Sequence, residues 1–209
     1  HSLRAVPWDQ VRKHLVESHQ RGLRLHVHLE EQPRELEEIK SAYGAHPVQL
    51  LLNSGLPLEH VVGVHMTHTS EREMVEWLDR GGMILPCPLT EGDLGDGVPV
   101  LPDLPDLGMA LALGTDSNLR ISMFEEMRRL EHDQRCRTLR RGALRCGGTA
   151  PSEVLWSAAS TGGRKALGLP MTGPMLSIDE GHALLAGAKD SSLLDALVFG
   201  ADERVLRTV

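Results

Sequence analysis

The feature that most constrains the fold is a short strand at residues 23–29 that ends in chemically reactive side chains. Leucine and valine occupy every second position there, which is the two-residue period of an extended chain. His26 and His28 therefore share one face, and Glu31 follows where the strand ends. An imidazole and a nearby carboxylate suit a metal ligand beside a proton-transfer group. A His-x-His strand on its own more often holds two hydrogen-bonded histidines, so the interpretation depends on the segments downstream.

Strands and helices alternate along the chain. Gly22 and Gly44 mark two helix ends, and Pro33 suits the first turn of the helix that Gly44 ends. We expect helices at residues 8–21, 33–43, 47–53, 71–80, 123–140 and 151–167, and strands at 23–29, 61–68, 83–86 and 109–118, with a long loop at 87–107. Short apolar strands that alternate with helices indicate a parallel β/α architecture.

Polar side chains collect where the predicted strands end. His28 and Glu31 follow the first strand, His65 ends the second, Glu91 follows the third, and Asp116 ends the fourth. In a (β/α)8 barrel the carboxyl ends of the strands carry the catalytic groups. Four strands make half of such a barrel. Glu91 receives less weight than the others, because loop carboxylates are more often solvated than functional.

Composition narrows the class of partner. The chain has 209 residues, a formal net charge of −7 and only 3% aromatic residues, so its core is aliphatic and nucleic-acid binding is not expected. The three scattered cysteines form no metal-binding or disulfide pattern, which favours the cytoplasm. With neither a membrane-spanning run nor a signal peptide in view, we expect a small-molecule substrate and no membrane partner. The start at His1, without Met, suggests a fragment.

Five stretches carry a more specific signal. They are His-Ser-Leu-Arg-Ala-Val at 1–6, His-Val-His-Leu-Glu-Glu-Gln at 26–32, Val-His-Met-Thr-His at 64–68, Thr-Glu-Gly-Asp-Leu-Gly-Asp-Gly at 90–97, and Gly-Thr-Asp-Ser at 114–117. Together they resemble the amidohydrolase superfamily and, within it, the formimidoylglutamate deiminases. The strand-end His, His and Asp series is shared across the superfamily, whereas the first and fourth stretches favour this one family.

The resemblance implies a fold and a metal. It assigns residues 1–170 to the C-terminal half of a (β/α)8 barrel, with strands five to eight and the end of strand four. Residues 171–209 would be the remnant of a small accessory β domain. One divalent metal, Zn²⁺, is implied, with His28 on the fifth strand and Asp116 on the eighth strand as its ligands. A homodimer is implied for the complete protein.

The resemblance also implies roles for further residues. Glu31 would be the acid/base carboxylate, and His65 would help polarise the reacting group. Asp116 would take a proton from the metal-bound water. His1 and Arg4 would grip the glutamate part of the substrate, in keeping with the bidentate match between a guanidinium and a carboxylate.

The chain departs from the family pattern in two places. The first-strand His-x-His pair, which supplies two further zinc ligands in the family, is absent. Residues 173–181 are shorter than the family's apolar strand. The pair His26 and His28 is not the first-strand pair itself, because only one strand-end histidine and one further strand precede the Asp116 strand.

The implied reaction is zinc-dependent hydrolysis of N-formimidoyl-L-glutamate to N-formyl-L-glutamate and ammonia, a step of histidine degradation. One alternative is a related deaminase of a heterocycle such as guanine. Arg4 distinguishes the two, because a dicarboxylate substrate needs a guanidinium whereas a purine needs flat apolar walls. The other is a catalytically inactive, truncated chain that binds a partner. We expect these 209 residues alone to self-associate or aggregate and to lack activity.

Overall fold

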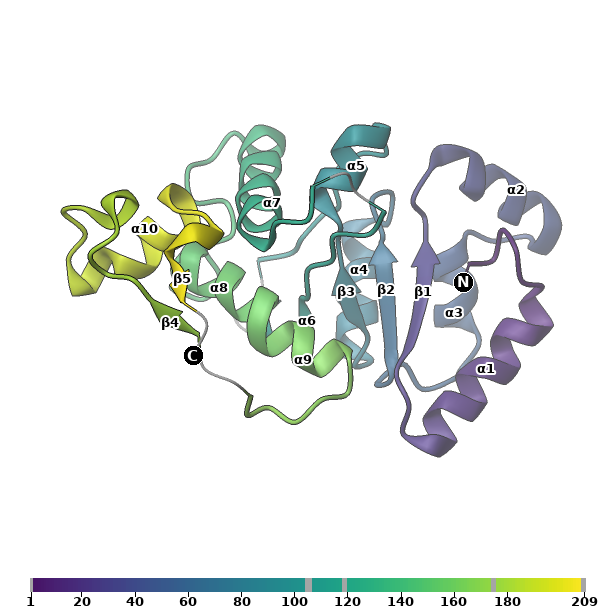
Figure 1. Cartoon of the computed structure of the whole chain (residues 1–209). Helices are drawn as coiled ribbons and strands as arrows, with labels where there is room; N and C mark the ends of the chain where they lie inside the picture. Colours follow the sequence, from purple (N-terminus) through teal and green to yellow (C-terminus); the bar gives the residue numbers. More distant parts are fainter. Residues whose placement is uncertain (1, 104–106, 118–119, 174–175, 208–209) are drawn as a thin grey trace.

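The computed structural model describes residues 2–103, 107–117, 120–173 and 176–207. Its centre is a parallel sheet with the strand order β1 (Leu25–Leu29), β2 (Val61–His65) and β3 (Met83–Leu85), flanked by helices (Figure 1). Leu25 pairs with Val61 in the register of β1 and β2. Strands that are neighbours in sequence are therefore neighbours in the sheet, as in a barrel.

Two isolated bridges extend the sheet on both sides. Ser2 pairs in parallel with His28 beyond β1, and Leu111 pairs in parallel with Ile84 beyond β3. Five chain segments thus lie side by side in sequence order. This arrangement is the α/β fold of a partial (β/α)8 barrel, which confirms the predicted fold class.

The first four helices confirm their predicted positions. They are α1 (Trp8–Arg21), α2 (Pro33–Tyr43), α3 (Pro47–Asn53) and α4 (Glu71–Asp79). The glycines that follow α1 and α2 adopt the left-handed conformation, with φ of 63° and 81°, which a residue with a side chain rarely adopts. A capping box between Ser70 and Glu73 begins α4.

The predicted loop at residues 87–107 is wrong in part. It contains α5 (Pro88–Leu94), which begins with proline in its first turn and ends at Gly95 in the left-handed conformation. These are ordinary helix signals, but seven residues are too few for a hydrophobic period to reveal. The helix places Glu91 in its first turn, where the sequence had suggested a solvated loop carboxylate.

The predicted strand at 109–118 is also shorter than expected. Residues Leu107–Ala110 form a helical turn, α6, and only Leu111 makes a bridge. The extended course continues, since the Ala112 N–H donates to Ile84 O at 2.8 Å. A short apolar run is compatible with a helical turn or a strand, so its pattern does not separate them. Residue 118 lies outside the described residues.

Three further helices follow the segment that contains Leu111. They are α7 (Met123–Thr138), α8 (Pro151–Ser157) and α9 (Gly163–Ala166), with the π-helical segment η1 (Ala158–Gly162) between the last two. A side chain at Gly162 would place its Cβ 1.9 Å from Leu111 O, so only glycine fits this contact. The helix predicted at 151–167 is therefore confirmed in position but interrupted by a π-helical turn.

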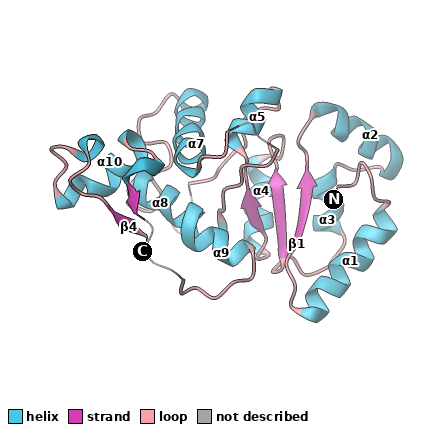
Figure 2. Ribbon diagram, viewed as in Figure 1, coloured by secondary structure: helices cyan, strands magenta, loops and turns pink. Residues whose placement is uncertain are grey.

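The last described residues form small elements that pack on α7 and α8. The elements are β4 (Ser177–Ile178), η2 (Ala183–Leu185), η3 (Asp190–Ser192), α10 (Leu193–Gly200), η4 (Glu203–Val205) and β5 (Leu206–Arg207), with β4 antiparallel to β5 (Figure 2). Leu197 and Val198 belong to the main hydrophobic core. In the described part of residues 173–181 the strand is limited to the two residues of β4, and the domain boundary at 170 stays a prediction.

The two faces of the sheet are covered differently. The main core contains Val27, Leu29 and Val61 with the helices that follow them in sequence. On the other face Ala166, at the end of α9, packs against a small cluster that includes Val62 and Met83. Among the described residues no helix has both the length and the apolar character that a bilayer crossing requires.

Candidate active site and metal centre

Three candidate ligands meet at the carboxyl ends of the strands. His28 lies on β1, His65 ends β2, and Asp116 follows the segment that pairs with β3. One ligand atom from each lies within 4.8 Å of the other two. The rings of His28 and His65 have their centroids 5.3 Å apart. In the described part of the chain this is the one group of three or more His, Cys, Asp or Glu side chains that could hold a metal ion.

The backbone bends sharply at this site. His65 has a φ of 68°, Asp116 a φ of 47° and Glu30 a φ of 53°, all in the left-handed region. Such conformations cost on the order of 1–3 kcal/mol each and concentrate at functional sites. The strand ends are thus turned so that their polar side chains converge.

Glu31 lies beside the cluster and is held by two groups. Its Oε1 is 3.9 Å from His65 Nε2, and its Oε2 accepts a hydrogen bond from Arg4. The Glu31 N–H donates to Glu35 Oε2 at 3.0 Å, and Arg4 Nε is 4.0 Å from the same oxygen. The structure therefore brings Arg4 and Glu31 together, whereas His1 lies outside the described residues.

The buried side chain of Glu30 fixes the turn before Glu31. Its Oε1 accepts the Val48 N–H at 3.0 Å, and its Oε2 accepts the Thr69 hydroxyl at 2.7 Å. The Thr67 hydroxyl reaches the carbonyl oxygens of Glu30 and Glu31 at 2.8 and 2.9 Å. Sequence reasoning missed Glu30, because its place on the polar face of a strand gives no sign of burial.

His65 is fully buried and lies close to the carboxylates of Glu91, Glu31 and Asp116. Its Nδ1 is 3.2 Å from Glu91 Oε1, while its Nε2 lies 3.8 Å from Asp116 Oδ2 and has no hydrogen-bond partner among the described residues. Burial opposes its charged form, but the hydrogen bond to Glu91 and the charges of Glu91, Glu31 and Asp116 outweigh burial. Together they raise the pKa of His65 above its usual value.

His28 shows the opposite tendency. Burial, followed by the charge of His65, lowers its pKa, which favours the neutral ring. A neutral imidazole keeps a lone pair, and this is the form that binds a metal. His26, on the same strand face, instead donates from Nε2 to Ala166 O at 2.9 Å. This contact makes His26 a packed residue rather than a candidate ligand.

The donor set fits a divalent metal of the zinc type. Catalytic zinc sites use three protein ligands drawn from imidazoles and carboxylates, plus an open position. His28, His65 and Asp116 offer two ring nitrogens and one carboxylate, and His65 Nε2 is a buried atom without a partner. The structure thus adds His65, which the sequence suggested only as a polarising group, to the side chains within reach of such an ion.

Two further polar residues lie close to Glu31. Gln32 Nε2 donates to Asp96 Oδ1 at 3.1 Å, and Asp96 is only 2% exposed. The contact links the loop after α5 to the start of α2.

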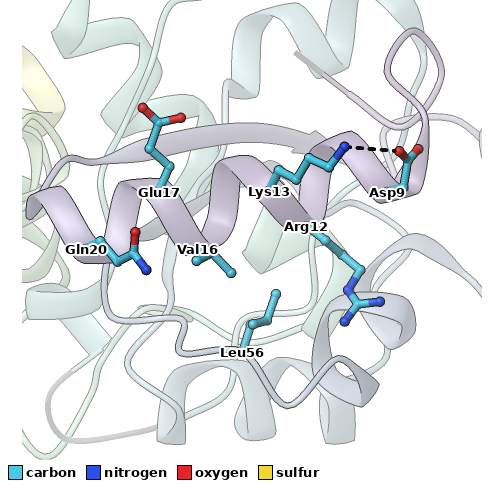
Figure 3. Close-up of a pocket in the computed structure, with 7 residues that line it drawn as sticks. All are labelled: Asp9, Arg12, Lys13, Val16, Glu17, Gln20 and Leu56. Atoms are coloured by element: carbon cyan, nitrogen blue, oxygen red, sulfur yellow. Dashed lines mark ion pairs between the residues drawn. The ribbon is translucent and has the colours of Figure 1, made fainter.

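A separate hollow of about 470 Å³ lies against the outer face of α1 (Figure 3). Val16 and Leu56 form its apolar part, and Lys13 pairs with Asp9 at 3.8 Å on one side. It contains none of the residues of the cluster. Its carboxylates are exposed, so we assign it no part in the chemistry.

Comparison with known proteins identifies the family. Residues 1–174 match the amidohydrolase family. This chain belongs to the amidohydrolase family. Over its whole length it is 32% identical to the formimidoylglutamate deiminase of Pseudomonas aeruginosa, of which it covers 48%. The resemblance suggested by the sequence is thereby confirmed.

Other amidohydrolases are similar as well. Over 68% of the chain it is 35% identical to a 5-methylthioadenosine/S-adenosylhomocysteine deaminase of Pyrococcus furiosus, of which it covers 33%. The solved structure of an amidohydrolase from Brucella melitensis matches 100% of this chain and 49% of that chain, with a TM-score of 0.82 and 28% identity. The chain thus spans half the length, or less, of these relatives.

Proposed function

We propose that the chain is the C-terminal half of a zinc-dependent deiminase that converts N-formimidoyl-L-glutamate and water into N-formyl-L-glutamate and ammonia, a step of histidine degradation. One observation carries the proposal. The candidate metal cluster, the carboxylate of Glu31 and the guanidinium of Arg4 converge at one end of the sheet. The similarity to a deiminase over the whole chain supports the same reaction.

The chemistry requires a nucleophile, a proton carrier and a leaving group. Zinc bound by His28 and Asp116 would lower the pKa of a water molecule to about 7 and so supply hydroxide at neutral pH. Oxygen adds to the formimidoyl carbon, and the bond from that carbon to its terminal nitrogen then breaks. Ammonia leaves, and a formyl group remains.

The side chains near the cluster divide the proton transfers. Asp116 accepts a proton as the water is activated, and Glu31 carries a proton to the departing nitrogen. His65 turns its unpartnered Nε2 toward both carboxylates, where its lone pair accepts a hydrogen bond from an N–H of the formimidoyl group and so polarises the reacting group. Burial of His65 strengthens this interaction, because water does not compete with it.

Arg4 sets the choice of substrate. Its guanidinium is part-exposed and bonded to Glu31, so a carboxylate of the substrate can approach it from the open side. A glutamate derivative offers such a carboxylate, whereas guanine does not. The similarity to a nucleoside-type deaminase favours a heterocycle deaminase as the second candidate, and a chain without catalysis remains the third.

The test compares two arginine variants of the complete protein. Arg4→Met should raise KM for N-formimidoyl-L-glutamate by about 30-fold or more, the equivalent of about 2 kcal/mol for a lost charge-assisted contact, with little change in zinc content. Arg34→Met is the matched control, because among the described residues Arg34 pairs only with Glu38, on the exposed face of α2. Equal losses of zinc and substrate affinity in Arg4→Met would contradict the substrate assignment. Ammonia release from guanine but not from the formimidoyl compound would favour the second candidate.

A further inference from the structure

The orientation of His65 depends on one buried carboxylate. Glu91 is 3% exposed and lies in the first turn of α5, facing the end of β2. Its Oε1 accepts the Cys87 N–H at 2.8 Å and lies 3.2 Å from His65 Nδ1. The same oxygen therefore contacts both the start of α5 and the ring of His65.

This contact determines which ring nitrogen of His65 carries the proton. As a carboxylate, Glu91 has no hydrogen to donate, so its Oε1 accepts both the Cys87 N–H and a hydrogen from the His65 ring. His65 Nδ1 thus carries the hydrogen. In the neutral ring Nε2 then keeps its lone pair, and Nε2 is the atom that faces Glu31 and Asp116 without a partner.

We propose that Glu91 is a positioning residue, which fixes the ring of His65 with its proton on Nδ1 and so leaves the Nε2 lone pair directed at the reacting centre. The inference rests on the proposed function for its effect on turnover. The ring projects from a left-handed turn, with φ of 68° at His65, a conformation that concentrates at functional sites. Loss of a carboxylate behind a functional histidine typically costs about 10- to 100-fold.

A purely structural role is the competing explanation. Glu91 could serve only to cap α5 through the Cys87 N–H. The two roles differ in what they do to His65. If Glu91 only caps α5, its removal leaves the proton of His65 on Nδ1 as long as α5 stays folded. If Glu91 positions His65, its removal abolishes the preference for Nδ1.

The experiment uses the complete protein without metal, with ¹⁵N-labelled histidine, and records the side-chain nitrogen resonances of His65 while the ring is neutral. We expect the wild type to carry the proton on Nδ1. In Glu91→Ala this preference should disappear, and Glu91→Gln, which keeps an acceptor oxygen, should restore part of it. Glu126→Gln is the matched control. Glu126 is a buried glutamate on α7 that accepts the Leu89 N–H of α5, as Glu91 accepts the Cys87 N–H, but no contact between Glu126 and His65 is seen among the described residues.

Turnover of the zinc-loaded protein provides the second readout. We expect kcat to fall by about 10- to 100-fold in Glu91→Ala, with KM and zinc content close to those of the wild type and partial recovery in Glu91→Gln. Unchanged His65 resonances in both Glu91 variants would overturn the inference. Should Glu91→Ala fail to fold, Glu91→Gln alone decides, through a weakened Nδ1 preference. Absence of deiminase activity in the wild type would refute the proposed function but leave the resonance test intact.

Discussion

Replacing Glu126 by glutamine should make the protein more stable at neutral pH and leave it unchanged in acid. Glu126 is fully buried on α7, where one carboxylate oxygen accepts the Leu89 N–H at 2.9 Å and the other has no partner. Burial, with the charges of Glu91, Glu125 and Asp93, raises its pKa from 4.5 to about 7. The folded state therefore holds a proton that the unfolded chain has already released.

The sign of the effect follows from proton counting. Between pH 4.5 and about 7 the unfolded chain binds fewer protons at Glu126 than the folded protein does, so the free energy of unfolding falls as pH rises. The loss is complete above the folded pKa. A change of about 2.5 units in pKa corresponds to about 3–4 kcal/mol, because each unit is worth about 1.4 kcal/mol, and about 3 kcal/mol is the expected upper limit here after screening by solvent.

Glu126→Gln removes this pH dependence but keeps an acceptor for the Leu89 N–H. Urea unfolding of variant and wild type, followed by circular dichroism across this pH range, measures the difference directly. We expect the two proteins to be similar below pH 4.5 and the variant to gain up to about 3 kcal/mol above pH 7. Glu17→Gln, on the exposed face of α1, is the control and should show less than about 0.5 kcal/mol throughout. A difference between Glu126→Gln and wild type that does not vary with pH would refute the reasoning.

Two other substitutions test the site and its support. Asp116→Asn in the complete protein should abolish ammonia release, because we propose that Asp116 holds the metal and takes a proton from the water. Circular dichroism and melting temperature should stay close to the wild type, because Asp116 is part-exposed; retention of most activity would contradict the assignment. Gly162→Ala should lower the free energy of unfolding by about 1–3 kcal/mol or more, since the new Cβ would collide with Leu111 O, whereas Gly200→Ala meets no neighbour; equal stability of the two variants would contradict the close approach.

Much of the fold was predictable because its elements carry local signals. Helix α1 ends at Gly22 and α2 begins at Pro33, as backbone chemistry requires, and the strands stand out as short apolar runs. The helical turn α6 was mistaken for part of a strand, since its apolar residues fit either structure. The turn packs against α8 and η1, which lie about fifty residues later in the chain, and no local pattern records such contacts.

The residues of the candidate site also fall into those that the sequence could indicate and those that it could not. His28, His65 and Asp116 could be proposed from the sequence because each follows an apolar strand, and the structure brings them together. Glu30 and Glu91 could not be given roles, because their importance lies in burial and in partners more than fifteen residues away in sequence. The predicted homodimer, the cytoplasmic location and the roles of the individual site residues stay predictions.

The most direct test of the account is zinc-dependent ammonia release from N-formimidoyl-L-glutamate by the complete protein. The account predicts that the purified protein releases ammonia and forms N-formyl-L-glutamate, that a chelator abolishes this, and that added Zn²⁺ restores it. Turnover that survives complete removal of the metal, or ammonia release from purines alone, would contradict the central claim that His28, His65 and Asp116 belong to a metal-dependent deiminase site.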